Sequence, residues 1–262
     1  NGILKFEGNI WDKKFVPAEE LLYNTVALGD DTIKQVNQKY WVQMGKDLIG
    51  PSEESKFGYV VKLNNDGNIL VVGAQEYNNN QGLVIAYEWD GENWNQKGNM
   101  ISGIENSNNG RFGKNLDINN DGSVIAIAAP FEMITFNGGP NGYVKVYEFI
   151  NNEWVQRGDT FIGQQGHTRG SGLSLNDNGD VIAIGENGYG GNYLGRTGIF
   201  RWNKLKWEQV GDYIEGEFGD DWSGDPVSLN NDGTVVYIGE SKYSNRSYQG
   251  KARIFQWNGN NW

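Results

Sequence analysis

Short hydrophobic runs that alternate with polar residues recur along the chain, and turns rich in Gly, Asn and Asp separate them. Examples are "ILVVG" from Ile69, "VIAIG" from Val181 and "VVYIG" from Val235. Runs of this length, bounded by such turn residues, are typical of β-strands rather than helices. The pattern therefore predicts an all-β fold built from short strands.

These strands belong to a repeat that occurs four times. Aligned on one glycine, the copies are "FGYVVKLNNDGNILVVGA" from Phe57, "FGKNLDINNDGSVIAIAA" from Phe112, "RGSGLSLNDNGDVIAIGE" from Arg169 and "SGDPVSLNNDGTVVYIGE" from Ser223. In every copy a second Gly follows the first after nine positions. A conserved internal spacing of this kind indicates a repeat architecture in which each copy is one structural unit.

A second motif lies between these copies. It reads "WVQMGKDLIG" from Trp41, "WNQKGNMISG" from Trp94, "WVQRGDTFIG" from Trp154 and "WEQVGDYIEG" from Trp207. The residues just before each later tryptophan predict a strand, a short turn and the start of another strand. Each unit thus contains four strands. Four short antiparallel strands in a repeat of 53 to 60 residues are typical of a β-propeller blade.

The motifs resemble the FG-GAP-like repeats of integrin-α-type propellers. They resemble more closely the variant of secreted microbial and algal-type proteins, with W-x-Q-x-G, I-x-G, L-N-x-D-G and A-I-G elements across residues 41–262. The resemblance implies a propeller that serves adhesion or ligand binding, and it leaves the ligand undefined. Two departures stand out. Arg169 and Ser223 replace the Phe of "FG", and the third and fourth copies end in Gly185-Glu186 and Gly239-Glu240.

The number of blades depends on the N-terminal residues. Residues 11–50 predict a degenerate blade, because "TVALG", the pair Asp30-Asp31 and "TIKQV" take the places of a strand, a turn and a strand. We therefore predict one propeller domain over 1–262. Its five blades would occupy about 11–50, 51–103, 104–163, 164–216 and 217–262. Residues 2–8 would close the ring as the missing outer strand, since an open sheet edge promotes aggregation. The alternative is a fragment of a six- or seven-bladed propeller.

Composition and charge exclude several partners. The 38 Gly, 10 Trp and 13 Tyr fit many turns and aromatic strands. A formal net charge of −11 disfavours nucleic acid and anionic membranes. No apolar run approaches the roughly 18 residues of a membrane span, so no membrane insertion is expected. The absence of Cys excludes disulfides and thiolate zinc sites. A first residue other than Met favours a processed precursor, and we expect a secreted or surface- or particle-associated protein.

The turn between the first two strands of each unit resembles a cation loop. In integrin-type propellers this hairpin binds calcium through D-x-[DN]-x-D-G-x-x-D. Asp117, Asn119 and Asp121 approach that motif, but Ile125 occupies the ninth position. The favoured interpretation is a tight turn in which Asn and Asp bond their own backbone and Gly adopts positive φ. No cofactor is predicted apart from calcium at these three residues, as the alternative.

The tryptophans that open the fourth strands are predicted to staple neighbouring blades, with the ring packed and the N–H at the rim. The long loops all emerge on one face, because successive strands alternate in direction. Variable loops on a rigid scaffold commonly carry binding. The predicted ligand-binding residues are the aromatic residues of these loops: Tyr77, Phe131, Tyr189, Tyr193, Trp222, Tyr243 and Tyr248.

Aromatic rings beside amides and carboxylates suit either a sugar or a protein partner. The sequence therefore predicts a non-enzymatic, lectin-like binding or adhesion propeller. One alternative is a structural or assembly component of a surface layer or particle. Another is a glycoside hydrolase with carboxylates at the channel mouth, for which the acidic residues are Glu186, Glu240, Asp220, Asp221 and Asp225. A single histidine, His167, disfavours a Ser-His-Asp enzyme. Divergent loops predict one asymmetric site rather than four equal ones.

Overall fold

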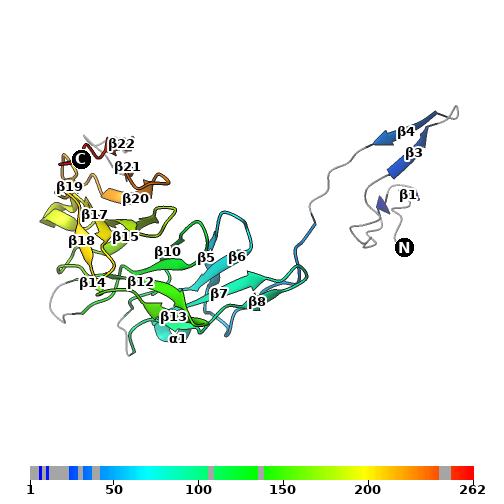
Figure 1. Ribbon diagram of the computed structural model, residues 1–262, viewed down its shortest axis with the longest axis horizontal. Helices are drawn as coiled ribbons and strands as arrows, with labels where there is room; N and C mark the ends of the chain where they lie inside the picture. The colour runs from blue at the N-terminus through cyan, green and yellow to red at the C-terminus, as the bar shows by residue number, and fades with distance from the viewer. Residues whose placement is uncertain are drawn as a thin grey trace. The chain divides into compact units, whose positions relative to one another are not determined.

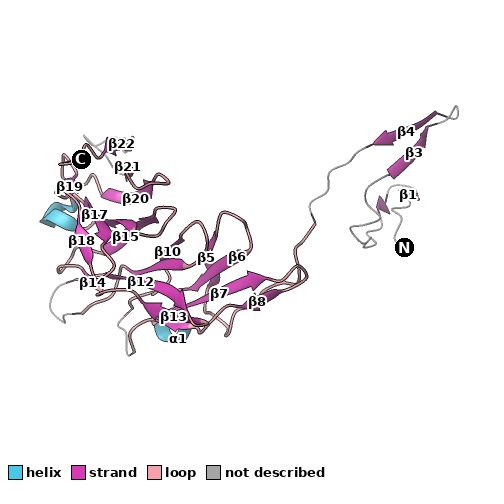
Figure 2. Cartoon of the chain, in the orientation of Figure 1, coloured by secondary structure: helices cyan, strands magenta, loops and turns pink. Residues whose placement is uncertain are grey.

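The computed structural model describes residues 42–105, 109–134, 139–241 and 249–262, together with the backbone of four strands nearer the N-terminus. The chain forms two compact units, residues 1–46 and 47–262. Figure 2 shows strands and loops with two short helical segments, α1 (Tyr77–Asn80) and the π-helical turn η2 (Tyr189–Tyr193). The prediction of an all-β fold is confirmed.

The N-terminal unit contains two antiparallel pairs. Strand β1 (Phe6–Glu7) pairs with β2 (Ile10–Trp11), and β3 (Asn24–Leu28) pairs with β4 (Thr32–Val36). The second pair lies where the sequence predicts two strands joined by a turn. Of the predicted closing strand at residues 2–8, only the backbone of β1 is described, so ring closure stays a prediction.

The second unit consists of four antiparallel sheets that follow one another along the chain. The first sheet contains β5 (Phe57–Leu63), β6 (Ile69–Ala74), β7 (Leu83–Trp89), β8 (Trp94–Gln96) and β9 (Ile101–Ser102). The second contains β10 (Asn115–Ile118), β11 (Val124–Ala129), β12 (Tyr143–Ile150), β13 (Glu153–Gln156) and β14 (Phe161–Ile162). The third contains β15 (Arg169–Leu175), β16 (Val181–Glu186), β17 (Arg196–Trp202), β18 (Trp207–Gln209) and β19 (Ile214–Glu215). The fourth contains β20 (Ser223–Leu229), β21 (Val235–Glu240) and β22 (Lys251–Gln256).

The outer edge of the first three sheets differs from the sequence prediction. Where one fourth strand is expected, two short strands pair with the same neighbour, as β8 and β9 do with β7. The break falls at the Gly of W-x-Q-x-G: Gly98, Gly158 and Gly211 have φ of 72°, 77° and 70°. Glycine adopts such values without steric cost, and a strand cannot continue through them.

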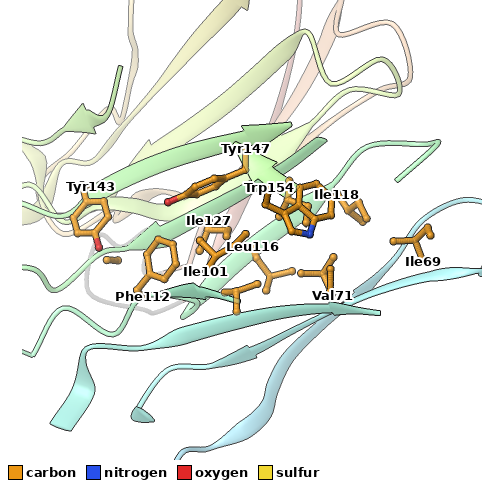
Figure 3. Packing of buried hydrophobic residues seen from close by; sticks show 14 residues of the cluster. Ile69, Val71, Ile101, Phe112, Leu116, Ile118, Ile127, Tyr143, Tyr147 and Trp154 are labelled. Carbon is orange, nitrogen blue, oxygen red and sulfur yellow. The ribbon is translucent and has the colours of Figure 1, made fainter. Parts of the chain in front are cut away.

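The sheets pack face to face, and a hydrophobic core lies between each consecutive pair. Figure 3 shows the core between the first two sheets, in which Ile69, Val71 and Ile101 of the first sheet meet Phe112, Leu116, Ile118, Ile127, Tyr143, Tyr147 and Trp154 of the second. The first strands of consecutive sheets also contact one another, in the order β5, β10, β15, β20 (Figure 1). This is the packing of a β-propeller-like fold.

Both ends of this stack of sheets leave apolar positions exposed. Val61 and Leu63 on β5 are 53% and 55% exposed, and Ile254 on β22 is 72% exposed. The repeat places Leu116 and Ile118 of the second sheet in register with Val61 and Leu63, and there they are only 2% and 8% exposed. The terminal sheets therefore present the same apolar surface that the inner sheets bury.

An asparagine at the same repeat position closes the hairpin between the first two strands of each sheet. In all four sheets its Oδ1 accepts a hydrogen bond, 2.8 Å long, from the backbone N–H five residues later; these residues are Asn64, Asn119, Asn176 and Asn230. The Gly in each turn has φ between 67° and 76°. The predicted turn is confirmed, and it satisfies backbone groups that a buried hairpin end would otherwise leave unpaired.

The motif tryptophans bind the sheets to one another. Trp154, Trp207 and Trp262 donate their indole N–H to the carbonyl oxygens of Lys97, Arg157 and Val210 in the preceding sheet, at 2.8, 3.0 and 2.8 Å. Each ring packs against the Gly of the preceding W-x-Q-x-G, where a Cβ at Gly98 would lie 3.0 Å from Trp154 Cδ1. The predicted staple is confirmed for these three residues.

Candidate functional site

The long loops of the second unit lie at one end of its sheets, which we call the loop end. It is the end at which the second strand of each sheet finishes and the first and third strands begin. In the first sheet Ala74 finishes β6 and pairs with Phe57 of β5 and Leu83 of β7. The corresponding residues of the second sheet, Phe112, Ala129 and Tyr143, are also apolar and buried.

The same three positions are charged or polar in the last two sheets. In the third sheet Glu186 finishes β16 and pairs with Arg169 and Arg196. In the fourth, Glu240 finishes β21 and pairs with Ser223 and Lys251. The residues that depart from the "FG" and "GAP" motifs are thus cross-strand neighbours. Charged and polar side chains stand in the third and fourth sheets where the first two sheets have apolar ones.

Two arginines and His167 surround Glu186, whose side chain is 1% exposed. Arg169 Nη2 contacts Oε1, Arg196 donates from Nε and Nη2 to Oε2 at 2.9 Å each, and His167 Nδ1 lies 3.1 Å from Oε2. The Arg196 guanidinium also lies 4.1 and 3.9 Å from the ring centroids of Tyr189 and Tyr213. A buried carboxylate requires such compensation, because desolvation of an unpaired charge costs several kcal/mol, on the order of 3 or more.

A second ionic group continues into the fourth sheet. Glu240 is fully buried, with Lys251 Nζ 3.1 Å and Arg253 Nη2 2.6 Å from its carboxylate oxygens. Burial lowers the pKa of Lys251, but the hydrogen bonds to Glu217 and Glu240 outweigh it and raise that pKa overall. Arg253 also donates to the Glu215 carbonyl oxygen.

The two ionic groups are joined through Tyr189. A hydrogen bond to the Glu215 carboxylate raises the pKa of the Tyr189 phenol, and Arg196 lies over the ring of the same tyrosine. The resulting chain of contacts runs along the loop end from His167 in the third sheet to Lys251 in the fourth.

An aromatic pair lies beside this ionic chain. The rings of Tyr193 and Trp222 stack with centroids 5.3 Å apart and an interplanar angle of 27°. Tyr193, Asp220 and Trp222 have φ of 57°, 64° and 55°, in the left-handed region that is costly for such side chains. The pair joins the loop after β16 to the loop after β19.

Backbone hydrogen bonds hold these two loops together. Trp222 N–H donates to the Tyr193 carbonyl at 3.0 Å, and Asp220 N–H donates to the Asn192 carbonyl at 2.7 Å. The buried Asp221 carboxylate accepts hydrogen bonds from the N–H groups of Glu217 and Phe218 at 3.0 and 2.8 Å. The aromatic pair is therefore presented on fixed backbone, while Tyr193 remains 49% exposed.

The other predicted aromatic residues lie apart from this pair. Tyr77 packs against the first sheet with Phe57 and Tyr87, and Phe131 lies 5.8 Å from the Arg111 guanidinium. Tyr189 belongs to the ionic chain, with the His167 ring edge-on at 5.1 Å. Tyr243 and Tyr248 lie outside the described residues.

The predicted calcium ligands make protein contacts. Asp117 bonds Lys62 Nζ at 3.1 Å and the Leu175 N–H at 2.8 Å, so it links three first strands. Burial raises the pKa of Asp121, but hydrogen bonds from Ser123 and Asn119 lower it overall. A group of three His, Asp or Glu side chains suited to a metal is absent from the described part of the chain. Calcium at Asp117, Asn119 and Asp121 stays a prediction.

No protein-family model and no curated protein sequence matches the chain. Similar solved structures include the hydrazine synthase of Kuenenia stuttgartiensis, with 14% identity and a TM-score of 0.48 over 75% of this chain and 57% of that one. Another is a putative 6-phosphogluconolactonase from Bacteroides uniformis, with 10% identity and a TM-score of 0.45 over 75% of this chain and 54% of that one.

The chain thus spans slightly more than half the length of these two structures. The class that its sheets define is an all-β, β-propeller-like repeat protein. None of its described helices is both long and apolar enough to cross a membrane.

Proposed function

We propose that the chain is a non-enzymatic binding propeller that recognises a glycan through the loop end of its third and fourth sheets. The observation that carries this proposal is the stacked pair of Tyr193 and Trp222 on loops joined by backbone hydrogen bonds. A fixed aromatic surface suits a sugar ring, because its C–H face stacks on the ring without an entropic cost of ordering the side chains.

Polar groups for the sugar hydroxyls lie on the same two loops. Asn192 and Asp220 are both exposed; Asn192 directly precedes Tyr193, and Asp220 lies two residues before Trp222. Amide and carboxylate oxygens accept hydrogen bonds from hydroxyl groups, and an aromatic platform with a few convergent polar groups is typical of small-ligand sites. A protein partner is the second class of ligand that such anchors fit.

A glycan array tests the proposal. We expect signals dominated by one type of sugar, with binding weakened about tenfold or more by Tyr193→Ala or Trp222→Ala, as for loss of a stacking contact. Leu205→Ala is the matched control, because Leu205 is 86% exposed in the turn between β17 and β18, at the opposite end of the sheet. Absence of binding to every sugar on the array, together with a protein partner recovered by cross-linking, would favour an assembly role instead.

The contacts of three of the five acidic candidates support a binding role over hydrolysis. A glycoside hydrolase needs two carboxyl groups that are free to act as acid and as base or nucleophile. Glu186 and Glu240 are instead buried against cations, and Asp221 caps a loop. We propose no catalytic residues, and we propose secretion or surface display from the resemblance to adhesion propellers.

We also propose that residues 11–50 form a fifth blade and that the strand near residues 2–8 completes the ring. The apolar positions exposed at both ends of the stack, such as Leu63 and Ile254, support this proposal. Deletion of residues 1–46 is then expected to lower the urea midpoint of the remaining sheets. An unchanged midpoint would contradict a five-bladed ring.

A further inference from the structure

A second cluster of polar groups lies at the loop end, between the first and second sheets. It consists of Tyr59 on β5, Gln75 directly after β6, and Arg111 and Lys114 just before β10. We call these four residues the cationic cluster. They share no residue with the ionic chain or with the Tyr193–Trp222 pair, and therefore need their own explanation.

The members of the cationic cluster contact one another. Lys114 Nζ donates to the Tyr59 hydroxyl and lies 4.2 Å from the centroid of its ring. The backbone N–H of Lys114 donates to the Arg111 carbonyl at 2.9 Å, which places both residues on one turn, and Arg111 Nε donates to Asn109 Oδ1 at 3.3 Å. The hydrogen bond and the charge of Lys114 lower the pKa of Tyr59, and burial opposes this effect. The charge of Arg111 and a hydrogen bond from Gln75 lower the same pKa further.

The two cations lack the counter-charges found elsewhere in the molecule. Lys97, Arg157 and Arg253 each contact a carboxylate, as do the arginines around Glu186. Within the described ranges no carboxylate forms an ion pair with Arg111 or Lys114. The charge of Lys114 also acts on the Asp225 carboxylate, so the positive charge is partly compensated. Two adjacent cations without a direct ion pair, in a chain of net charge −11, still attract an anion.

Gln75 provides a second, independent indication. Its side chain is 2% exposed, and its Oε1 is buried with no hydrogen-bond partner among the residues that the structure describes. Buried carbonyl oxygens almost always accept a hydrogen bond, so an unmatched one next to a cationic group points to a missing donor. A ligand hydroxyl is such a donor once the Gln75 side chain turns toward it, because the oxygen has no accessible surface in the unliganded chain.

Phe131 completes the surroundings. Its ring lies under the Arg111 guanidinium at 5.8 Å, which adds an apolar surface next to the charge. A sugar acid has an anionic group, hydroxyl groups and an apolar C–H face. These match the cations and the Gln75 oxygen of the cluster and the neighbouring Phe131 ring. The negative net charge of the chain favours a monoanionic carboxylate over a phosphate dianion, because repulsion grows with ligand charge.

We propose that the cationic cluster is a binding site for a hydroxylated carboxylate of the sugar-acid class, either free or as a uronate unit of a polysaccharide. Lys114 and Arg111 hold the carboxylate, Phe131 contacts the C–H face of the ring, and Gln75 accepts a hydrogen bond from the hydroxyl side. The site is separate from the proposed glycan surface at Tyr193 and Trp222, so either proposal can fail alone.

Isothermal titration of the full chain with sodium glucuronate, glucose and inorganic phosphate tests this site. We expect binding of glucuronate, at least tenfold weaker binding of glucose and phosphate, and a loss of about tenfold or more on Lys114→Met, as for removal of a hydrogen bond to a charged group. Lys62→Met is the matched control, because Lys62 is on β5 but is paired with Asp117 at 3.1 Å. Its affinity should stay within about twofold of the parent chain.

Titration with a uronate oligomer distinguishes the two sources of the ligand, a free sugar acid and a polysaccharide. Binding much tighter than that of the monomer would assign the site to a polysaccharide, and equal binding would assign it to a free sugar acid. The proposal is overturned if glucuronate does not bind at about 20 mM, near the weakest affinity of interest, if glucose or phosphate binds as well, or if the Lys114 and Lys62 variants lose affinity equally. Urea midpoints of both variants show that the fold is retained, and Arg111→Met, with the same expected loss, serves as a second variant if Lys114→Met does not fold.

Discussion

Removal of the Glu186 carboxylate is expected to be among the most destabilising single changes in the second unit. Glu186→Ala leaves Arg169 and Arg196, with side chains 10% and 12% exposed, without their carboxylate. Arg169 keeps a hydrogen bond of 3.1 Å to the Tyr213 hydroxyl, and Arg196 keeps its contacts with Tyr189 and the ring of Tyr213. Breaking a buried ion pair from one side costs about 3 to 5 kcal/mol. For a chain of this size the loss corresponds to a fall in Tm on the order of 6 to 20 °C.

The first sheet supplies the complementary variant. Its Phe57, Ala74 and Leu83 occupy the positions of Arg169, Glu186 and Arg196. The triple variant Arg169→Phe, Glu186→Ala, Arg196→Leu is therefore expected to recover most of the loss, because replacing a whole buried ionic group by packed apolar residues is often neutral or stabilising by about 1 to 4 kcal/mol.

Equilibrium unfolding in urea, an uncharged denaturant, measures the effect, with the slope m compared between variants to verify that the same surface is exposed. A loss below about 1 kcal/mol for Glu186→Ala would refute the argument, since it falls in the range of solvated ion pairs. A triple variant no more stable than the single one would also refute it.

Three further changes follow from the described contacts. Trp154→Phe removes the indole donor to the Lys97 carbonyl at 2.8 Å; we expect a loss of about 1 to 3 kcal/mol in urea unfolding, and an unchanged midpoint would disprove the staple. Asn176→Ala leaves the buried Val181 N–H without its acceptor and should cost about 1 to 3 kcal/mol, while the exposed equivalent Asn230→Ala should cost less. Burial raises the pKa of Asp225. A hydrogen bond from Asn187 and the charge of Lys114 lower it by less, so the pKa is raised overall. The folded state then binds the proton more tightly than the unfolded state, so stability falls as pH rises above the unfolded pKa of about 3.9. Asp225→Asn should therefore unfold at higher urea than the parent chain at pH 7 and at the same urea near pH 3, and the opposite order would contradict the burial argument.

The repeated features of the fold were predictable from sequence. The hairpin turns at Asn64 and Asn176 use local hydrogen bonds, so the same few residues give the same geometry in every copy. The tryptophan staples were predictable because a large ring with one donor recurs at a fixed position. Both features depend on local chemistry and a constant repeat period, so they can be predicted without knowledge of tertiary contacts.

The divergent features required the structure. Gly98 was visible as a motif residue, but its positive φ, which divides the outer strand, depends on close packing against Trp154. The ionic pair of Arg169 and Glu186 left a signal, since two apolar motif positions become charged in the same copy. Only the strand register shows that they are neighbours.

The aromatic pair was the least predictable feature. Tyr193 and Trp222 were both singled out as loop aromatics, but their stacking depends on left-handed backbone at non-glycine residues in two separate loops. No propensity rule favours such a conformation, because it is imposed by the surrounding hydrogen bonds. Sequence alone therefore identified the residue types without their arrangement.

The ionic group of the third sheet links this arrangement to stability. Glu186 and Arg196 are the last and first residues of β16 and β17, and their ion pair closes the base of the loop that carries η2 and Tyr193. Next to this base, Gly195 forms a parallel bridge with Ser223, and one side of the loop is held where the Trp222 N–H donates to the Tyr193 carbonyl. A loop fixed at its base and along one side loses less conformational entropy when a ligand stacks on it. The replacement of an apolar group by an ionic one in this sheet thus gives the proposed site a rigid support. It follows that Glu186→Ala should weaken ligand binding at Tyr193, although Glu186 is buried and has no exposed surface to offer the ligand.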